Sequence, residues 1–81
     1  MDDRDILDRV NELVNEEHNL RSELRAGAIG SDEEHRRLGE LEAALDQCWD
    51  LLRQRRARQV AGQDPDEAAP RTSGQVEGYL Q

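Results

Sequence analysis

Apolar residues recur at alternating intervals of three and four between residues 38 and 52, and this repeat constrains the fold more than any other feature of the chain. The repeat consists of Leu38, Leu41, Leu45, Cys48 and Leu52. Such spacing is the seam of an α-helix that packs along another helix. Trp49 and Leu51 lie beside the seam and widen the apolar surface beyond what one neighbouring helix covers. The stretch therefore predicts a helix that has two helical neighbours.

The first part of the chain supplies one of these neighbours. Its apolar residues recur with the period of a helix, at Ile6, Val10, Leu13, Leu20 and Leu24. They predict a helix over about residues 3–26, which Asp2 or Asp3 caps and Gly27 ends. Glu17 stands where the stripe calls for an apolar residue. Arg37 is the candidate ion partner for Glu17 across the two helices, and the alternative is a Glu17 that faces solvent.

The second helix is predicted over about residues 31–61. Ser31 and Glu34 match the S-x-x-E capping box, and Gly62 is expected to end the helix. The loop between the helices is short, so the second helix must turn back beside the first. The expected fold is all-α, with an antiparallel two-helix hairpin over residues 1–62.

Residues 63–81 have a different composition. They hold both prolines and two of the six glycines, and they show no helical period. We expect an extended or disordered tail that the hairpin does not need in order to fold. Its apolar residues Val76, Tyr79 and Leu80 either dock in a groove between helices or belong to a frayed terminus.

Assembly is expected because the chain has only 81 residues. A core of that size seldom supplies more than about 3–5 kcal/mol without a disulfide, a metal or a second subunit. We predict a homodimer, in the form of a four-helix bundle. The expected interface residues are Leu45, Cys48, Trp49, Leu51 and Leu52.

Charge narrows the choice of partner. The formal net charge is −8, which disfavours a general binder of nucleic acid or of a membrane surface. The basic residues that stand out are Arg53, Arg55, Arg56 and Arg58, which form a candidate contact patch facing solvent near the helix end. A single cysteine and the lack of a membrane-spanning apolar run favour a cytoplasmic protein.

Little in the sequence favours catalysis, and no cofactor is expected. The triplet Glu-Glu-His occurs at residues 16–18 and 33–35, and these side chains are of the kind that binds metals in helical bundles. The spacing lacks the Glu-x-x-His pattern, so a solvent-exposed polar surface is favoured over a metal site. Cys48 is interpreted as a small buried hydrophobic residue, since no charge in register would activate it.

Several motifs together resemble a family of small actinobacterial proteins known only as a domain of unknown function. The match includes LDQCWDLLRQRRA at residues 45–57, DPDEA at 64–68 and VEGY at 76–79. The resemblance implies a compact helical protein and assigns no activity and no functional residue.

The favoured hypothesis is a protein–protein interaction or regulatory module built on a self-associating helical hairpin, without catalytic activity. The alternative is an adaptor associated with nucleic acid or the transcription machinery, which would use the arginines at residues 53–58. A second alternative is a carboxylate–histidine metal-binding protein.

Overall fold

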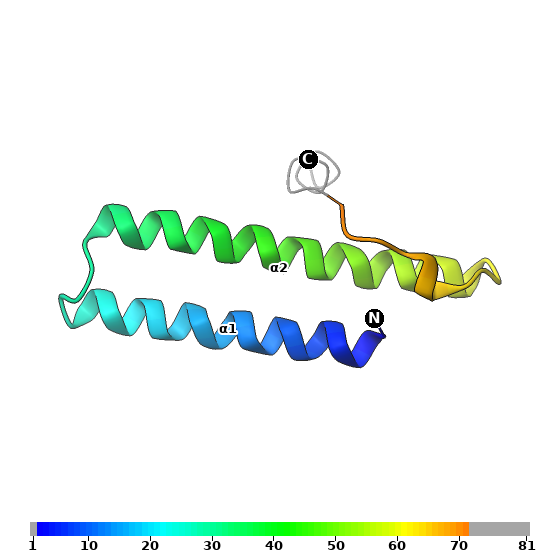
Figure 1. The fold of residues 1–81 in the computed structure, drawn as a ribbon, viewed down its shortest axis with the longest axis horizontal. Coiled ribbons are helices and arrows are strands. Elements are labelled where there is room, and N and C mark those ends of the chain that lie inside the picture. Colours follow the sequence, from blue (N-terminus) through cyan, green and yellow to red (C-terminus); the bar gives the residue numbers. More distant parts are fainter. Residues whose placement is uncertain (1, 72–81) are drawn as a thin grey trace.

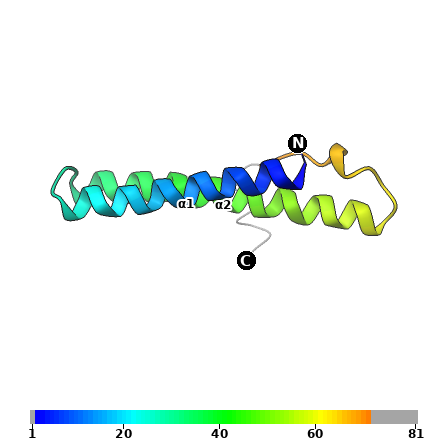
Figure 2. The same cartoon turned by 90° about the horizontal axis from the view of Figure 1, so that it is seen from below.

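The computed structural model describes residues 2–71 and confirms the all-helical hairpin. Helix α1 spans Asp3–Arg25, helix α2 spans Ser31–Val60, and a short 3-10 helix, η1, spans Pro65–Glu67. The two long helices run antiparallel and side by side (Figure 1). Seen from below, they form a single layer (Figure 2), and the molecule is 14 Å deep along its shortest axis. Both broad sides of this layer would face solvent if nothing else covered them.

Helix α1 begins and ends as its sequence predicts. Asp2 is the N-cap residue, and its side chain accepts a hydrogen bond from the Asp5 backbone N–H at 2.9 Å. The Asp5 side chain accepts in return from the Asp2 N–H, which completes a capping box. At the other end Gly27 adopts φ +73°, and the Ala28 N–H donates to the Glu23 carbonyl at 2.9 Å. These bonds satisfy backbone groups that the helix ends would otherwise leave unpaired.

The start of helix α2 differs from the prediction. Gly30, and not Ser31, is the N-cap residue, and no side chain caps the helix. Ser31 is the first helical residue, so the expected Ser31–Glu34 capping box is wrong. The three acidic residues of the first turn still stabilise the positive end of the helix dipole. The helix ends at Val60, with Ala61 as its C-cap residue, and Gly62 follows with φ +74°. The Gln63 N–H donates to the Arg58 carbonyl.

The core lies between the helices. On α1 the buried apolar residues are Ile6, Val10, Leu13 and Leu20, and on α2 Leu51 is buried to the same degree. The expected seam residues of α2 are half-buried: Leu38, Leu41, Leu45, Cys48 and Leu52. Because each helix has one long helical neighbour, the hairpin covers α1 more completely than it covers the wider apolar surface of α2.

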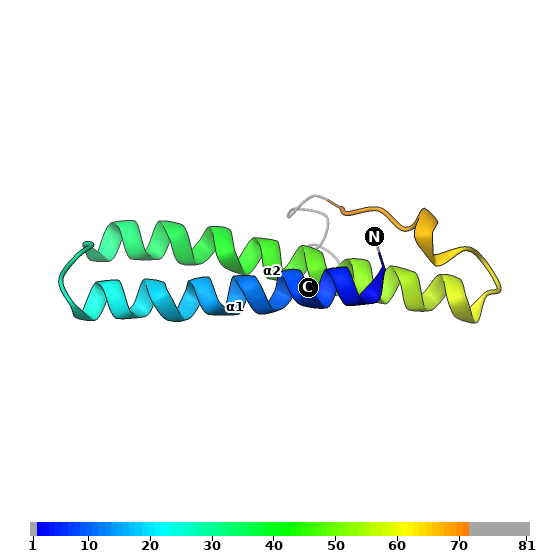
Figure 3. The same ribbon diagram turned by 60° about the horizontal axis from the view of Figure 1, so that its bottom comes forward.

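The described part of the tail turns back along α2. After Gly62 the chain passes through η1 and runs toward the interhelical loop beside the second half of α2 (Figure 3). Asp64 caps η1, because its side chain accepts a hydrogen bond from the Asp66 N–H at 2.9 Å. Residues 64–71 are thus packed against the hairpin, and this contact is absent from the expectation drawn from composition. Val76, Tyr79 and Leu80 lie outside the described residues.

Candidate functional site

Arg55 ties the tail and the start of α1 to helix α2. Its Nε donates to Asp3 Oδ1 at 2.6 Å, and one terminal nitrogen donates to Asp66 Oδ1 at 2.9 Å and to the Pro65 carbonyl at 3.2 Å. The residue is only 6 % exposed. Placing Arg55 in a solvent-facing patch is therefore wrong, because the returning tail covers it. A buried guanidinium with charged partners is expected to fix the register of the segments it joins.

Asp50 forms a second contact with the tail. This carboxylate is 0 % exposed and accepts hydrogen bonds from the Arg71 guanidinium on both oxygens, with the Nε bond at 2.9 Å. The Gln54 side-chain amide donates to the same carboxylate at 2.9 Å. The Arg71 guanidinium holds the pKa of Asp50 below its ordinary value, and Gln54 adds to this effect, while burial opposes it. Asp50 was not singled out from the sequence, since its burial depends on a residue 21 positions away.

Two glutamines of α2 bind the tail backbone. The side-chain amide of Gln54 donates to the Ala69 carbonyl at 2.8 Å, and that of Gln47 donates to the Arg71 carbonyl at 3.1 Å. With Asp50 they line one flank of α2, at spacings of three and four residues that repeat along a helix face. We call the surface that the tail covers the tail side. Its contacts are directional and polar, so they define where the tail lies.

The other arginines of the basic run differ in their surroundings. Arg58 lies 3.4 Å from Glu67 of the tail, and Arg53 lies 3.8 Å from Asp50. Arg56 is exposed. The predicted contact patch is thereby reduced to three residues, Arg53, Arg56 and Arg58, and it stays a prediction. Arg55 and Arg58 face carboxylates of the tail. These two arginines are therefore less available to nucleic acid than the sequence alone indicates, which weakens the adaptor hypothesis.

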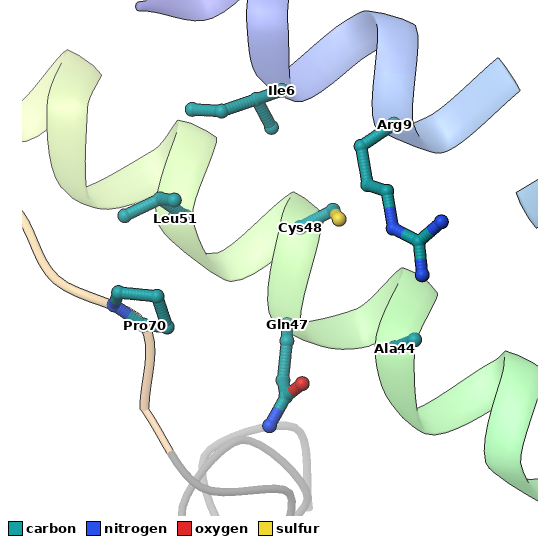
Figure 4. A pocket seen from close by; sticks show the side chains of 7 residues that line it. All are labelled: Ile6, Arg9, Ala44, Gln47, Cys48, Leu51 and Pro70. Atoms are coloured by element: carbon teal, nitrogen blue, oxygen red, sulfur yellow. The ribbon is translucent and has the colours of Figure 1, made fainter. Parts of the chain in front are cut away.

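A hollow between the helices lies at the edge of the tail side (Figure 4). Ile6 and Arg9 of α1 line it together with Ala44, Gln47, Cys48 and Leu51 of α2, and Pro70 of the tail borders it. Burial raises the pKa of the Cys48 thiol, and Arg9 nearby offsets part of this rise. A thiol with a raised pKa is a weak nucleophile at neutral pH, which agrees with a packing role for Cys48.

The opposite side of the hairpin carries exposed apolar residues. They are Leu7, Val14 and Trp49, with exposed fractions of 45, 38 and 45 %. Leu7 follows the buried Ile6 by about 100° around α1, and Val14 lies two turns further along. Arg9 and the hollow lie on the other flank of the same buried line. We call the surface formed by Leu7, Val14 and Trp49 the tryptophan face.

The predicted interface residues are therefore divided by the structure. Leu51 is buried on the tail side, and Cys48 lines the hollow. Leu45 and Leu52 are half-buried within the hairpin. Trp49 is 45 % exposed, so its side chain is only partly packed against the hairpin's own core. Apart from Val60 at the end of α2, the exposed large apolar residues of the described chain are Trp49, Leu7 and Val14.

The polar residues at the loop end form an ion pair within α1 and an ion pair between the two helices. Glu17 pairs with Arg21 of its own helix at 2.6 Å, and Arg37 pairs with Glu23 at 2.8 Å. Of the two alternatives for Glu17, the candidate pair with Arg37 is therefore wrong. Both histidines are exposed. Within residues 2–71, no group of three or more His, Cys, Asp or Glu side chains is arranged to hold a metal ion.

Neither long helix combines the length and the apolarity needed to cross a membrane, over the residues that the structure describes. The described surfaces offer recognition chemistry of two kinds. The tail side offers charged and amide groups that bind an extended segment. The tryptophan face offers apolar area, which drives association without fixing direction.

Comparison with known proteins confirms the resemblance seen in the sequence. The model of a family described as a protein of unknown function (DUF2630) matches residues 2–81. Uncharacterized proteins of Mycobacterium bovis and Mycobacterium tuberculosis are each 52 % identical over 77 residues, which cover 95 % of this chain and 88 % of theirs. No solved structure gives a significant match.

Proposed function

The chain belongs to the DUF2630 family of proteins of unknown function, and we propose that it is a protein–protein interaction module whose hairpin pairs with a second copy through the tryptophan face. The observation that supports this most is the difference between the two sides of the hairpin. The tail covers one side, whereas Leu7, Val14 and Trp49 stay exposed on the other. A second copy of the same hairpin would bury them in a four-helix bundle.

The three residues form one compact patch. The ion pairs Asp3–Arg55 and Glu23–Arg37 set the register of the two helices. In that register Trp49 of α2 is level with about Val10 of α1. Leu7 lies about one turn away on one side of this level, and Val14 lies about one turn away on the other.

Such a patch suits a two-fold symmetric dimer. A two-fold axis through the patch brings the same residues of two copies together, so one apolar surface covers the other. The half-buried Leu38 and Leu45 of α2 border the patch toward the loop and extend the apolar area. A tryptophan at the centre of an interface is the kind of residue that contributes most to binding.

Two matched substitutions test this proposal. Val14→Gln places a polar side chain in the tryptophan face, while Val60→Gln makes the same change at an 84 % exposed residue near the end of α2, beyond the start of α1. We expect Val14→Gln to raise the dimer dissociation constant about tenfold, equivalent to about 1.4 kcal/mol, because it buries a polar group. Val60→Gln should leave the constant unchanged.

Sedimentation equilibrium at micromolar concentrations measures both constants. Equal effects of the two substitutions would show that the tryptophan face is not the interface. A full-length protein that sediments only as a 9.3 kDa species would contradict self-association itself.

A further inference from the structure

We propose that the apolar end of this chain's own tail, Val76, Tyr79 and Leu80, docks in the groove between α1 and α2 on the tail side. These three residues lie outside the part of the chain that the structure describes. The groove and the point from which the tail would enter it are both described.

The groove consists of two adjoining hollows. The first is the hollow that Pro70 borders, beside Ile6 and Leu51. The second lies further toward the loop, where Leu13 and Leu41 line it together with the charged side chains of Glu16, Arg37 and Glu40. Arg9 and Ala44 line both hollows, so the two adjoin each other. The hairpin thus has an open groove that begins where the described tail ends.

The tail is held at the edge of this groove. The Arg71 carbonyl accepts a hydrogen bond from Gln47, which also lines the first hollow. Gln47 lies about one helical turn from Ala44, where the two hollows meet. Asp50 holds the Arg71 side chain at the same level. The chain therefore leaves its last described anchor beside the groove.

The remaining ten residues are long enough to reach along it. From Gln47 to Leu41 the axis of α2 advances about 9 Å, and from Gln47 to Arg37 about 15 Å. An extended chain covers up to about 17 Å between Arg71 and Val76 and about 28 Å between Arg71 and Tyr79. All three apolar residues can thus reach the second hollow, and Gly74 and Gly78 let the chain bend toward it.

The chemistry of the segment also suits the groove. The half-buried Leu41 and Ala44 supply the apolar surface that the segment can cover, because Leu13 beneath them is already only 1 % exposed. The charged groups of the second hollow come from Arg9, Glu16, Arg37 and Glu40. Residues 72–81 contain one charged side chain, Glu77, so the segment itself brings little charge to be desolvated. The Tyr79 ring can bury its apolar body while its hydroxyl stays beside the charged groups of the hollow.

Nuclear magnetic resonance of the full-length protein tests this proposal, because Tyr79 and Trp49 are the only aromatic residues of the chain apart from its two histidines. We expect nuclear Overhauser contacts between the Tyr79 ring and the methyl groups of Leu41 and Ala44. Tyr79→Leu keeps an apolar side chain but removes the ring, so these methyl resonances should shift. Gln75→Ala, a change at a neighbouring polar residue, should leave them in place.

Three results would overturn the proposal. The first is the absence of any contact between Tyr79 and the groove methyls. The second is contacts from Tyr79 to Leu7 or Val14, which would place the tail on the tryptophan face. The third is contacts that occur only between differently labelled copies in a mixed sample. Dimerisation is tested separately: Tyr79→Ser should leave the dimer dissociation constant unchanged, and a loss of the dimer would also overturn tail docking.

Discussion

The two sides of the hairpin are built from different interactions. On the tail side, Asp50, Arg55 and two glutamines bind residues 65–71 through hydrogen bonds and ion pairs between atoms at fixed positions. On the tryptophan face, three apolar side chains are exposed. Directional bonds select one position for an extended segment, whereas apolar area favours burial by any complementary surface. The tail covers part of one side of the hairpin, and we propose that a second copy of the chain covers the other side.

Both sides of the hairpin rest on one core between the helices. Substitution of Leu13 in this core should have the largest effect on stability. Leu13 is 1 % exposed, so Leu13→Ala should lower the free energy of unfolding by about 2–5 kcal/mol. Leu7→Ala, on the tryptophan face, should cost the isolated hairpin much less. Urea denaturation at the lowest usable protein concentration measures the free energy of unfolding of both variants. Similar losses would mean that Leu7 belongs to the core and that the two sides are not distinct.

Arg55 and Arg56 sharpen the description of the tail side, because they are neighbours in different surroundings. Arg55→Gln removes hydrogen bonds to Asp3, Asp66 and Pro65 and should lower the free energy of unfolding measurably. Arg56→Gln changes an exposed residue and should stay within about 0.5 kcal/mol of the original stability. Thermal denaturation compares the two. Equal and small effects would show that the tail is not held at Arg55.

Trp49→Ala tests the tryptophan face. We expect a loss of about 2 kcal/mol of association free energy, which raises the dimer dissociation constant about 30-fold. The unfolding of the separated hairpin should change less, since Trp49 is 45 % exposed there. Sedimentation velocity gives the first quantity, and denaturation at high dilution gives the second. A variant that dimerises normally but unfolds easily would assign Trp49 to the core.

The smallest effect concerns the pH dependence of tail binding. The pKa of Asp50 is lowered in the folded protein, so its stabilising contribution is complete above the ordinary carboxyl pKa of about 3.9 and is lost as the pH falls through the lower folded value. Asp50→Asn should cost about 1 kcal/mol at neutral pH. This difference from the original protein should shrink as the pH falls below about 3.9 toward the lowered pKa of Asp50. Denaturation over that range measures it, and a constant difference would argue against the Asp50–Arg71 pair.

Much of the fold could be predicted because it depends on local spacing. The heptad repeat of α2 and the apolar stripe of α1 indicate two helices, and Gly27 and Gly62 adopt the positive φ values expected where helices end. Ser31 misled the prediction of the start of α2. Gly30 provides the extended N-cap residue, so Ser31 enters the helix and cannot cap it.

The tail contacts could not be predicted, because they join residues far apart in the sequence. Asp50 is held by Arg71, 21 positions away, and Arg55 by Asp3 and Asp66, 52 and 11 positions away. One signal was present in the sequence. The acidic DPDEA segment follows closely after the arginine run, and opposite charges at that separation are compatible with a chain that turns back. Asp50, Gln47 and Gln54 could not be recognised as a site from the sequence, because their partners lie in the distant tail.

The fluorescence of Trp49 during dilution tests the central claim most directly, because Trp49 is the only tryptophan of the chain. If the tryptophan face pairs with a second copy, the emission of concentrated full-length protein should be that of a shielded indole. On dilution the emission should shift to that of an exposed indole, over the same concentrations at which sedimentation shows the mass falling to 9.3 kDa. Emission of an exposed indole at every concentration, with a dimer present by mass, would show that the copies associate through another surface.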